Sequence, residues 1–170
     1  MTAVVVYAHP SEASYTAVLR DAARRGLEAA GETVDVIDLW VDDFDPRRPE
    51  PFFTADRHVD RLAAASTLVL VYPTWWSGQP AILTGWLAAL PPDALRGVTR
   101  LVAVTAHGSS KWVNLLEGET GRRIVKHTLR RRCAPGARAE WHAFYGIDRA
   151  DDARRTAFVA EVERTLSRSR

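Results

Sequence analysis

Three short runs of almost uninterrupted apolar residues constrain the fold more than any other feature of this chain. They are residues 3–8 (AVVVYA), 67–72 (TLVLVY) and 100–105 (RLVAVT). A strand with one face in water alternates apolar and polar residues, whereas a strand covered on both faces is apolar along its length. The three runs therefore predict the central strands of a parallel sheet that has helices on both faces.

Helical segments alternate with these strands along the whole chain. Five helices are predicted. The first is capped by Ser14 and ends near residue 31, and the second is capped by Thr54 and ends near residue 65. The third begins at Pro80, the fourth spans residues 120–132, and the fifth starts at Asp151. Two shorter strands are expected at residues 33–39 and 137–145. Five successive strand–helix units imply a parallel sheet with right-handed crossovers.

The first turn after a strand decides between the two nucleotide-binding architectures of this kind. A dinucleotide-binding fold places a G-x-G-x-x-G motif there, but residues 9–16 read HPSEASYT and contain no glycine. We therefore expect a single flavodoxin-like α/β domain over residues 1–170. It is a three-layer sandwich around a five-stranded parallel sheet in the order 2-1-3-4-5.

Composition and charge exclude several classes of protein. The formal net charge is +2, and the arginines that cluster between residues 122 and 138 are interpreted as a solvated helix face, because no nucleic-acid-binding motif accompanies them. Cys133 is the only cysteine, so no disulfide can form within the chain, and no metal-ligand spacing is present. The first apolar run is too short for a signal peptide or a membrane span. We expect a cytoplasmic protein without membrane insertion or a nucleic-acid partner.

In the order 2-1-3-4-5, the loops after strands one, three and four meet at the ligand-binding edge of the sheet. The first loop, residues 8–17, offers backbone N–H groups, His9 and the hydroxyls of Ser11, Ser14 and Thr16 for a phosphate. An ordinary helix cap with a locally satisfied histidine would also explain it.

The second and third loops favour a flat ring system. Trp75 and Trp76 follow a buried strand and cannot both point inward, so at least one is expected to be exposed in the crevice. A structural pair that covers the sheet end is the alternative. In the third loop, residues 105–108 are small apart from His107, and their N–H groups could approach the carbonyl end of an isoalloxazine.

Together, the three loops resemble the NAD(P)H:quinone oxidoreductase (modulator of drug activity B-like) family of the flavodoxin-like superfamily. The resemblance is carried by AHPSEASY, YPTWWSGQPAILTGW and VTAHGSSKW, in the same order along the chain. It implies a homodimer that holds FMN or FAD non-covalently. It also implies that NADH or NADPH serves as electron donor for quinones, azo compounds or free flavins.

The resemblance also assigns cofactor-binding positions. His9, Ser14, Tyr15 and Thr16 match the flavin phosphate loop; Pro73, Thr74, Trp75 and Trp76 match the stretch along the isoalloxazine edge; Thr105, Ala106, His107 and Gly108 match the loop over its pyrimidine side. No catalytic residue and no metal ligand is assigned.

Three departures from the family pattern affect the substrate prediction. Thr16 stands where relatives have an asparagine, His107 stands where bacterial relatives have a tyrosine, and the segment 86–105 is shorter than the one that walls the substrate pocket in relatives.

The expected function is transfer of hydride from NAD(P)H, through the flavin, to a quinone or other small aromatic acceptor. The small domain slightly favours FMN over FAD. The alternative is a regulatory or pathway-specific flavodoxin-like protein with little general quinone reductase activity. An electron carrier is disfavoured, because such carriers are usually strongly acidic.

Overall fold

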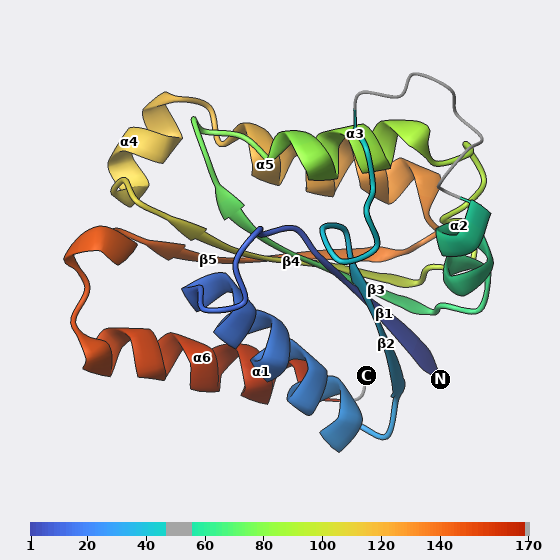
Figure 1. The fold of residues 1–170 in the computed structure, drawn as a ribbon, viewed down its shortest axis with the longest axis horizontal. Coiled ribbons are helices and arrows are strands. Elements are labelled where there is room, and N and C mark those ends of the chain that lie inside the picture. Colours follow the sequence, from blue (N-terminus) through green and yellow to red (C-terminus); the bar gives the residue numbers. More distant parts are fainter. Residues whose placement is uncertain (47–55, 169–170) are drawn as a thin grey trace.

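The computed structural model describes residues 1–46 and 56–168, and it places one parallel five-stranded sheet between two layers of helices (Figure 1). The strands are β1 (Thr2–Tyr7), β2 (Thr33–Asp38), β3 (Thr67–Thr74), β4 (Arg100–His107) and β5 (Arg138–Tyr145). All four neighbouring pairs are parallel, and the order is β2-β1-β3-β4-β5. The predicted flavodoxin-like fold class and strand order are confirmed.

The helices are α1 (Tyr15–Ala29), α2 (Asp56–Ala63), α3 (Ala81–Ala89), α4 (Lys111–Leu116), α5 (Thr120–Arg123) and α6 (Asp152–Leu166). Figure 1 shows α1 and α6 below the sheet and α3 and α5 above it, with α4 at the end to which β4 and β5 point. None of the helices in the described part of the chain is long and apolar enough to cross a membrane.

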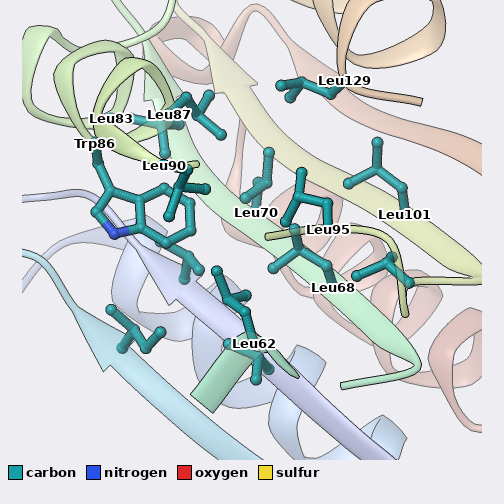
Figure 2. Packing of buried hydrophobic residues seen from close by; sticks show 14 of the residues in the cluster. Leu62, Leu68, Leu70, Leu83, Trp86, Leu87, Leu90, Leu95, Leu101 and Leu129 are labelled. Carbon is teal, nitrogen blue, oxygen red and sulfur yellow. The ribbon is translucent and has the colours of Figure 1, made fainter. Parts of the chain in front are cut away.

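Each face of the sheet buries its own apolar cluster, because successive strand residues point to opposite faces. Leu68 and Leu101, in register on β3 and β4, belong to one cluster together with residues of α3. Figure 2 shows this cluster, in which Trp86 of α3 lies among leucines. Trp86 is fully buried, and its indole Nε1 donates to Nδ1 of His58 at 3.0 Å. The opposite face carries Val69 and its neighbours under α1 and α6.

Several element boundaries differ from the sequence-based expectation. Ser14 caps α1 with its side chain as expected, whereas Asp151 and Pro80, which were expected to begin their helices, immediately precede α6 and α3, and Asp151 caps α6 with its side chain. The helix expected over residues 120–132 starts as α5, continues as the π-helical turn Ile124–Leu129 and ends as a 3₁₀ turn. Thr54, the expected cap of α2, lies outside the described residues. The helix α4 was not expected.

An ion pair ties the edge strand β5 to the sheet interior. Arg100 of β4 donates from Nε to Oε1 of Glu140 at 2.9 Å, and His142 lies 3.4 Å from the second carboxylate oxygen. The hydrogen bonds from His142 and Arg100 lower the pKa of Glu140 to about 2 against the opposing effect of burial. The carboxylate is therefore charged in the folded protein at neutral pH.

Candidate functional site

The loops after β1, β3 and β4 surround one cavity of about 530 Å³ at the carboxyl ends of the strands. Of the predicted cofactor-binding residues, ten line it: His9, Ser14, Tyr15, Thr16, Pro73, Thr74, Trp75, Trp76, Ala106 and Gly108. Thr105 and His107 lie behind its wall, with exposed fractions of 0% and 4%. The cavity volume lies in the range of small-molecule and cofactor sites.

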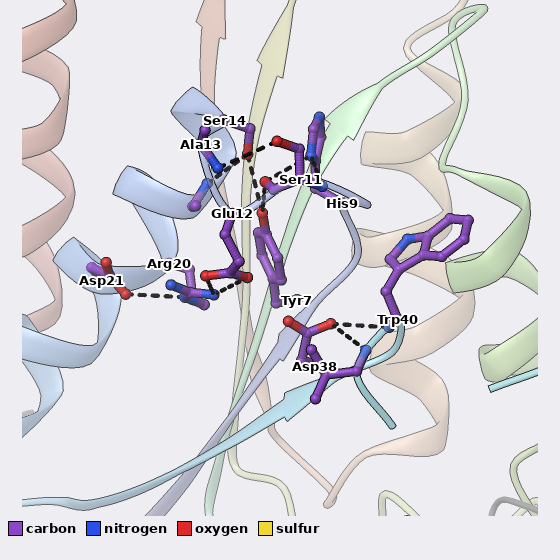
Figure 3. A network of polar contacts seen from close by, with 12 residues as sticks. Tyr7, His9, Ser11, Glu12, Ala13, Ser14, Arg20, Asp21, Asp38 and Trp40 are labelled. Carbon is purple, nitrogen blue, oxygen red and sulfur yellow. Dashed lines mark hydrogen bonds and ion pairs between the residues drawn. The ribbon is translucent and has the colours of Figure 1, made fainter. Parts of the chain in front are cut away.

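Ser14 anchors the first loop through two hydrogen bonds of its Oγ (Figure 3). Its Oγ accepts from the backbone N–H of Ala17 at 3.1 Å and so caps α1. The Tyr7 hydroxyl donates to the backbone oxygen of Ser11 at 2.8 Å, so in the 3.0 Å contact with Ser14 it is the serine hydroxyl that donates. Burial raises the pKa of Tyr7. This network fixes the start of α1 beside the cavity.

His9 presents a hydrogen-bond donor at the same end of the cavity. The backbone N–H of Ser11 donates to His9 Nδ1 at 3.0 Å, so the neutral ring carries its proton on Nε2. The first N–H groups of a helix have no partner within the helix, and the helix dipole favours negative charge there. The start of α1 and His9 together can bind an anionic group such as a phosphate.

Tyr15 contributes its ring rather than its hydroxyl. The hydroxyl donates to the backbone oxygen of Arg155 in α6 at 2.9 Å, and the ring lies 5.8 Å from that of Phe144. Burial raises the pKa of Tyr15 to about 12, so this hydroxyl stays protonated. Thr16, 4% exposed, places its side chain next to it in the cavity wall.

The second loop carries its two tryptophans on a tight turn. Trp75 and Gly78 exchange two backbone hydrogen bonds of 3.1 and 3.0 Å, and the central residues Trp76 and Ser77 have φ angles of 50° and 61°. Positive φ at both central positions is the geometry of a type I′ hairpin turn, which favours glycine or asparagine. Trp75 is 43% exposed with its ring 5.8 Å from His9, and Trp76 is fully exposed. The expected exposure of at least one tryptophan is confirmed.

The third loop brings its smallest residue against a carboxylate. A Cβ added at Gly108 would lie 2.5 Å from Oδ2 of Asp148, so only glycine fits there without displacing Asp148. Ala106 also lines the cavity. The loop therefore provides backbone and a close acidic neighbour rather than a bulky side chain.

Five further lining residues were missed from the sequence: Ser77, Ser109, Glu117, Ile147 and Asp148. Glu117 follows α4 and accepts a hydrogen bond from the Ser77 hydroxyl, which links α4 to the tryptophan turn. Ile147 and Asp148 belong to a 3₁₀ turn after β5, Ile147–Arg149. Ser110, which caps α4, was the available signal for that helix.

No cluster of three or more potential metal ligands occurs within residues 1–46 and 56–168. Cys133 is buried, outside this cavity, and burial raises the pKa of its thiol to about 11. The site thus offers an anion-binding end, exposed aromatic surface and a small-residue loop.

A protein-family model matches the amino-terminal half of the chain. The model of the family described as having the flavodoxin-like fold matches residues 1–89. The chain belongs to this flavodoxin-like family. The matched part of the flavodoxin-like chain includes the first two loops of the cavity.

The curated relatives share less than 30% identity with this chain over the matched residues. The ribosyldihydronicotinamide dehydrogenase [quinone] of Pongo abelii is 29% identical over 111 residues, which are 49% of this chain and 48% of that protein. The flavodoxin-like chain spans less than half the length of the curated relatives it matches. The resemblance to quinone oxidoreductases, stated above from the loop motifs, is confirmed by these relatives.

Solved structures that share the fold include two oxidoreductases. The NAD(P)H:quinone oxidoreductase of Methanothermobacter marburgensis has a TM-score of 0.82 and 22% identity, with 98% of this chain and 94% of that chain covered. The FMN-dependent NADH-azoreductase of Bacillus anthracis, solved in complex with FMN, has a TM-score of 0.70 and 17% identity, with 98% of each chain covered.

Proposed function

We propose that this protein is a flavin-dependent oxidoreductase that passes two electrons from NADH or NADPH to a quinone or another small aromatic acceptor. The observation that carries the proposal is the single cavity that gathers ten of the predicted flavin-binding residues from three separate loops. The name of the Pongo abelii relative supports a quinone as acceptor.

The residues present fit a flavin mononucleotide. The free N–H groups at the start of α1 and the Nε2–H of His9 suit its phosphate, because both are donors at a positive helix end. The exposed ring of Trp75, beside His9, suits contact with a flat ring system. When bound, the flavin supplies the two-electron chemistry, and the chain positions it and tunes its electronics.

FMN is the form we propose, rather than FAD. The cavity has a volume of about 530 Å³, and the described chain adds no subdomain beside the first loop that would enclose an adenosine. The FMN in the Bacillus anthracis azoreductase structure supports the same choice.

The apolar rim of the cavity supports a homodimer. Trp76, Trp112 and Leu116 are 101%, 76% and 87% exposed, and Leu115 on the same short helix is 54% exposed. Ser77 and Glu117 join the tryptophan turn to the end of this helix, so the two apolar groups lie close together. A second copy of the chain would cover this surface. Light scattering tests this: a monomer mass near 18.9 kDa would refute the dimer.

The decisive experiment is cofactor identification followed by turnover. The purified protein should show a visible flavin spectrum or bind added FMN, and heat should release FMN rather than FAD. With FMN bound, it should oxidise NADH or NADPH when a soluble quinone is added. Failure to bind either flavin at micromolar concentration would refute the site. Flavin binding without NAD(P)H oxidation would favour the regulatory alternative.

A further inference from the structure

A row of polar side chains crosses three neighbouring strands at the edge of the cavity. Thr74, His107 and Tyr145 are register partners on β3, β4 and β5. Thr74 lines the cavity, His107 is buried behind it, and the His107 ring stacks on Tyr145 with centroids 4.6 Å apart and an interplanar angle of 25°. His107 thus reaches the cavity through the Thr74 hydroxyl, whose Oγ1 lies 3.3 Å from its Nε2.

The orientation of the Asn114 side chain is fixed by a backbone carbonyl. Its Nδ2 lies 2.8 Å from the backbone oxygen of Ser110 and 2.8 Å from the hydroxyl of Ser109. A carbonyl oxygen can only accept, so the amide nitrogen must face Ser110. The amide oxygen Oδ1 consequently faces His107, with Oδ1 and the ring Nδ1 2.7 Å apart.

This orientation selects one tautomer of His107. An amide oxygen is an acceptor only, so Nδ1 of His107 carries the hydrogen that it receives. Tyr145 and Trp141 lie against the ring, and the hydrogen bond with Asn114 and the charges of Glu119 and Glu117 raise the histidine pKa. Desolvation by burial outweighs these effects and lowers the pKa of His107. The ring is therefore neutral at pH 7, and Nε2 has a free lone pair.

The direction of the remaining hydrogen bonds follows. Thr74 Oγ1 lies 3.3 Å from Nε2 of His107, and only the threonine can donate in this contact. The single hydroxyl proton of Thr74 is then used, so in the 2.8 Å contact with Thr105 the buried Thr105 hydroxyl must donate. Toward the cavity, Thr74 presents only an oxygen lone pair.

We propose that His107 is a positioning residue that holds the Thr74 hydroxyl as a hydrogen-bond acceptor toward the cavity. Asn114 sets this direction by selecting the Nδ1–H tautomer, and the site thereby favours a ring edge that presents an N–H group at Thr74. The proposal rests on the proposed flavin site, since an isoalloxazine ring edge carries such a group. A protonated His107 would donate to Thr74 and reverse the direction of these hydrogen bonds.

The first test uses the protein without cofactor and is therefore independent of the proposed function. Long-range ¹⁵N–¹H NMR of histidine-labelled protein distinguishes the two tautomers from the doubly protonated ring. The chain has five histidines, and His107→Phe identifies the signal by its loss. At pH 7 the signal should report a neutral ring with the proton on Nδ1. A proton on Nε2, or a charged ring, would overturn the proposal and leave the proposed function standing.

The second test measures FMN affinity in a double-mutant cycle. His107→Phe keeps a ring against Tyr145 but releases the Thr74 proton, and should weaken FMN binding about fivefold, the net effect of one hydrogen bond. Thr74→Val should weaken it by a similar factor, and His107→Phe should then add less than a twofold effect. If His107→Phe weakened FMN binding by the same factor in the wild type and in Thr74→Val, the two residues would not be coupled and the proposal would be overturned.

Two matched variants separate positioning from folding. Thr74→Ser keeps the hydroxyl and should bind FMN within twofold of the wild type. His107→Gln can place its amide oxygen where Nε2 accepts from Thr74, and should recover affinity relative to His107→Phe. A His107→Gln affinity as poor as that of His107→Phe, in a variant that melts like the wild type, would contradict the proposal. If wild-type protein binds no flavin at all, the proposed function fails, and the tautomer experiment alone decides this inference.

Discussion

Ser14 caps α1 and lies at the proposed phosphate site, and substitutions at this one position can separate the two roles. Its Oγ caps α1 by accepting from Ala17, and its proton satisfies Tyr7. Ser14→Ala removes the cap, which costs about 1 kcal/mol and at most about 2 kcal/mol. In a chain of 170 residues this corresponds to a fall in Tm of roughly 2–8 °C.

Asparagine and aspartate form a matched pair at the same position. Both are good helix caps, so Ser14→Asn and Ser14→Asp should melt close to the wild type. The pair differ by one negative charge beside the proposed phosphate site. Two unit charges about 4 Å apart repel by ~1 kcal/mol even in water, and a phosphate carries close to two charges. We expect FMN to bind at least tenfold more weakly to Ser14→Asp than to Ser14→Asn.

The assay is titration of FMN and riboflavin, followed by the quenching of flavin fluorescence, with thermal unfolding in parallel. Riboflavin lacks the phosphate, so its affinity should be the same in both variants. Added salt should narrow the FMN difference by screening. Equal FMN affinities in the two variants, or an equal loss for riboflavin, would refute the placement of the phosphate at the start of α1.

Four further predictions concern turnover, the cavity rim and the core. Initial rates against NAD(P)H at several fixed quinone concentrations should give parallel double-reciprocal lines, because donor and acceptor use one open face in turn; intersecting lines would contradict this. Trp76→Gly should raise Tm, because a tryptophan with positive φ costs about 1–3 kcal/mol that glycine avoids. The same variant should weaken flavin binding up to roughly tenfold, whereas Trp112→Ala should leave flavin binding unchanged. Gly26→Ala should destabilise the protein by about 1–3 kcal/mol in denaturant unfolding despite better helix propensity, because the new Cβ would lie 2.5 Å from the backbone oxygen of Glu163. The pKa of Glu140 is lowered from 4.5 to about 2, so its carboxylate stabilises the fold above pH 4.5 and loses this effect as the pH falls toward 2. Glu140→Gln should therefore be less stable than the wild type at pH 7, and its stability should depend less on pH between 4.5 and 2 in acid-unfolding experiments.

The sequence was sufficient for the fold because its strongest signals are periodic and local. Continuous apolar strands, the caps Ser14 and Asp151 and the glycine-free first turn together specify the strand order that the structure shows. The interruption at Ile124–Leu129 was not predictable, because a π-helical turn depends on packing rather than on residue pattern.

The candidate site was less completely predictable. Loop residues that follow strands could be placed together from topology alone, and most of them do share one cavity. The inward direction of His107 could not, because it depends on a buried partner, Asn114, in a helix that the sequence did not reveal. Asp148 was missed because it approaches the cavity from beyond β5, through contact with Gly108.

The contact between Asn114 of α4 and His107 has a dynamic consequence for this helix. The helix has six residues, exposes Trp112, Leu115 and Leu116, and buries only Asn114. A helix this short has almost no stability of its own, and its attachment rests on the hydrogen bonds of that one amide and on the hydrogen bond of Ser77 to Glu117 at its C-terminal end. Its amides should therefore exchange with solvent through local opening, long before those of the sheet, which open only with global unfolding. The segment between Ser109 and Glu117, two residues that line the cavity, is therefore expected to open on a faster timescale than the fold that carries it.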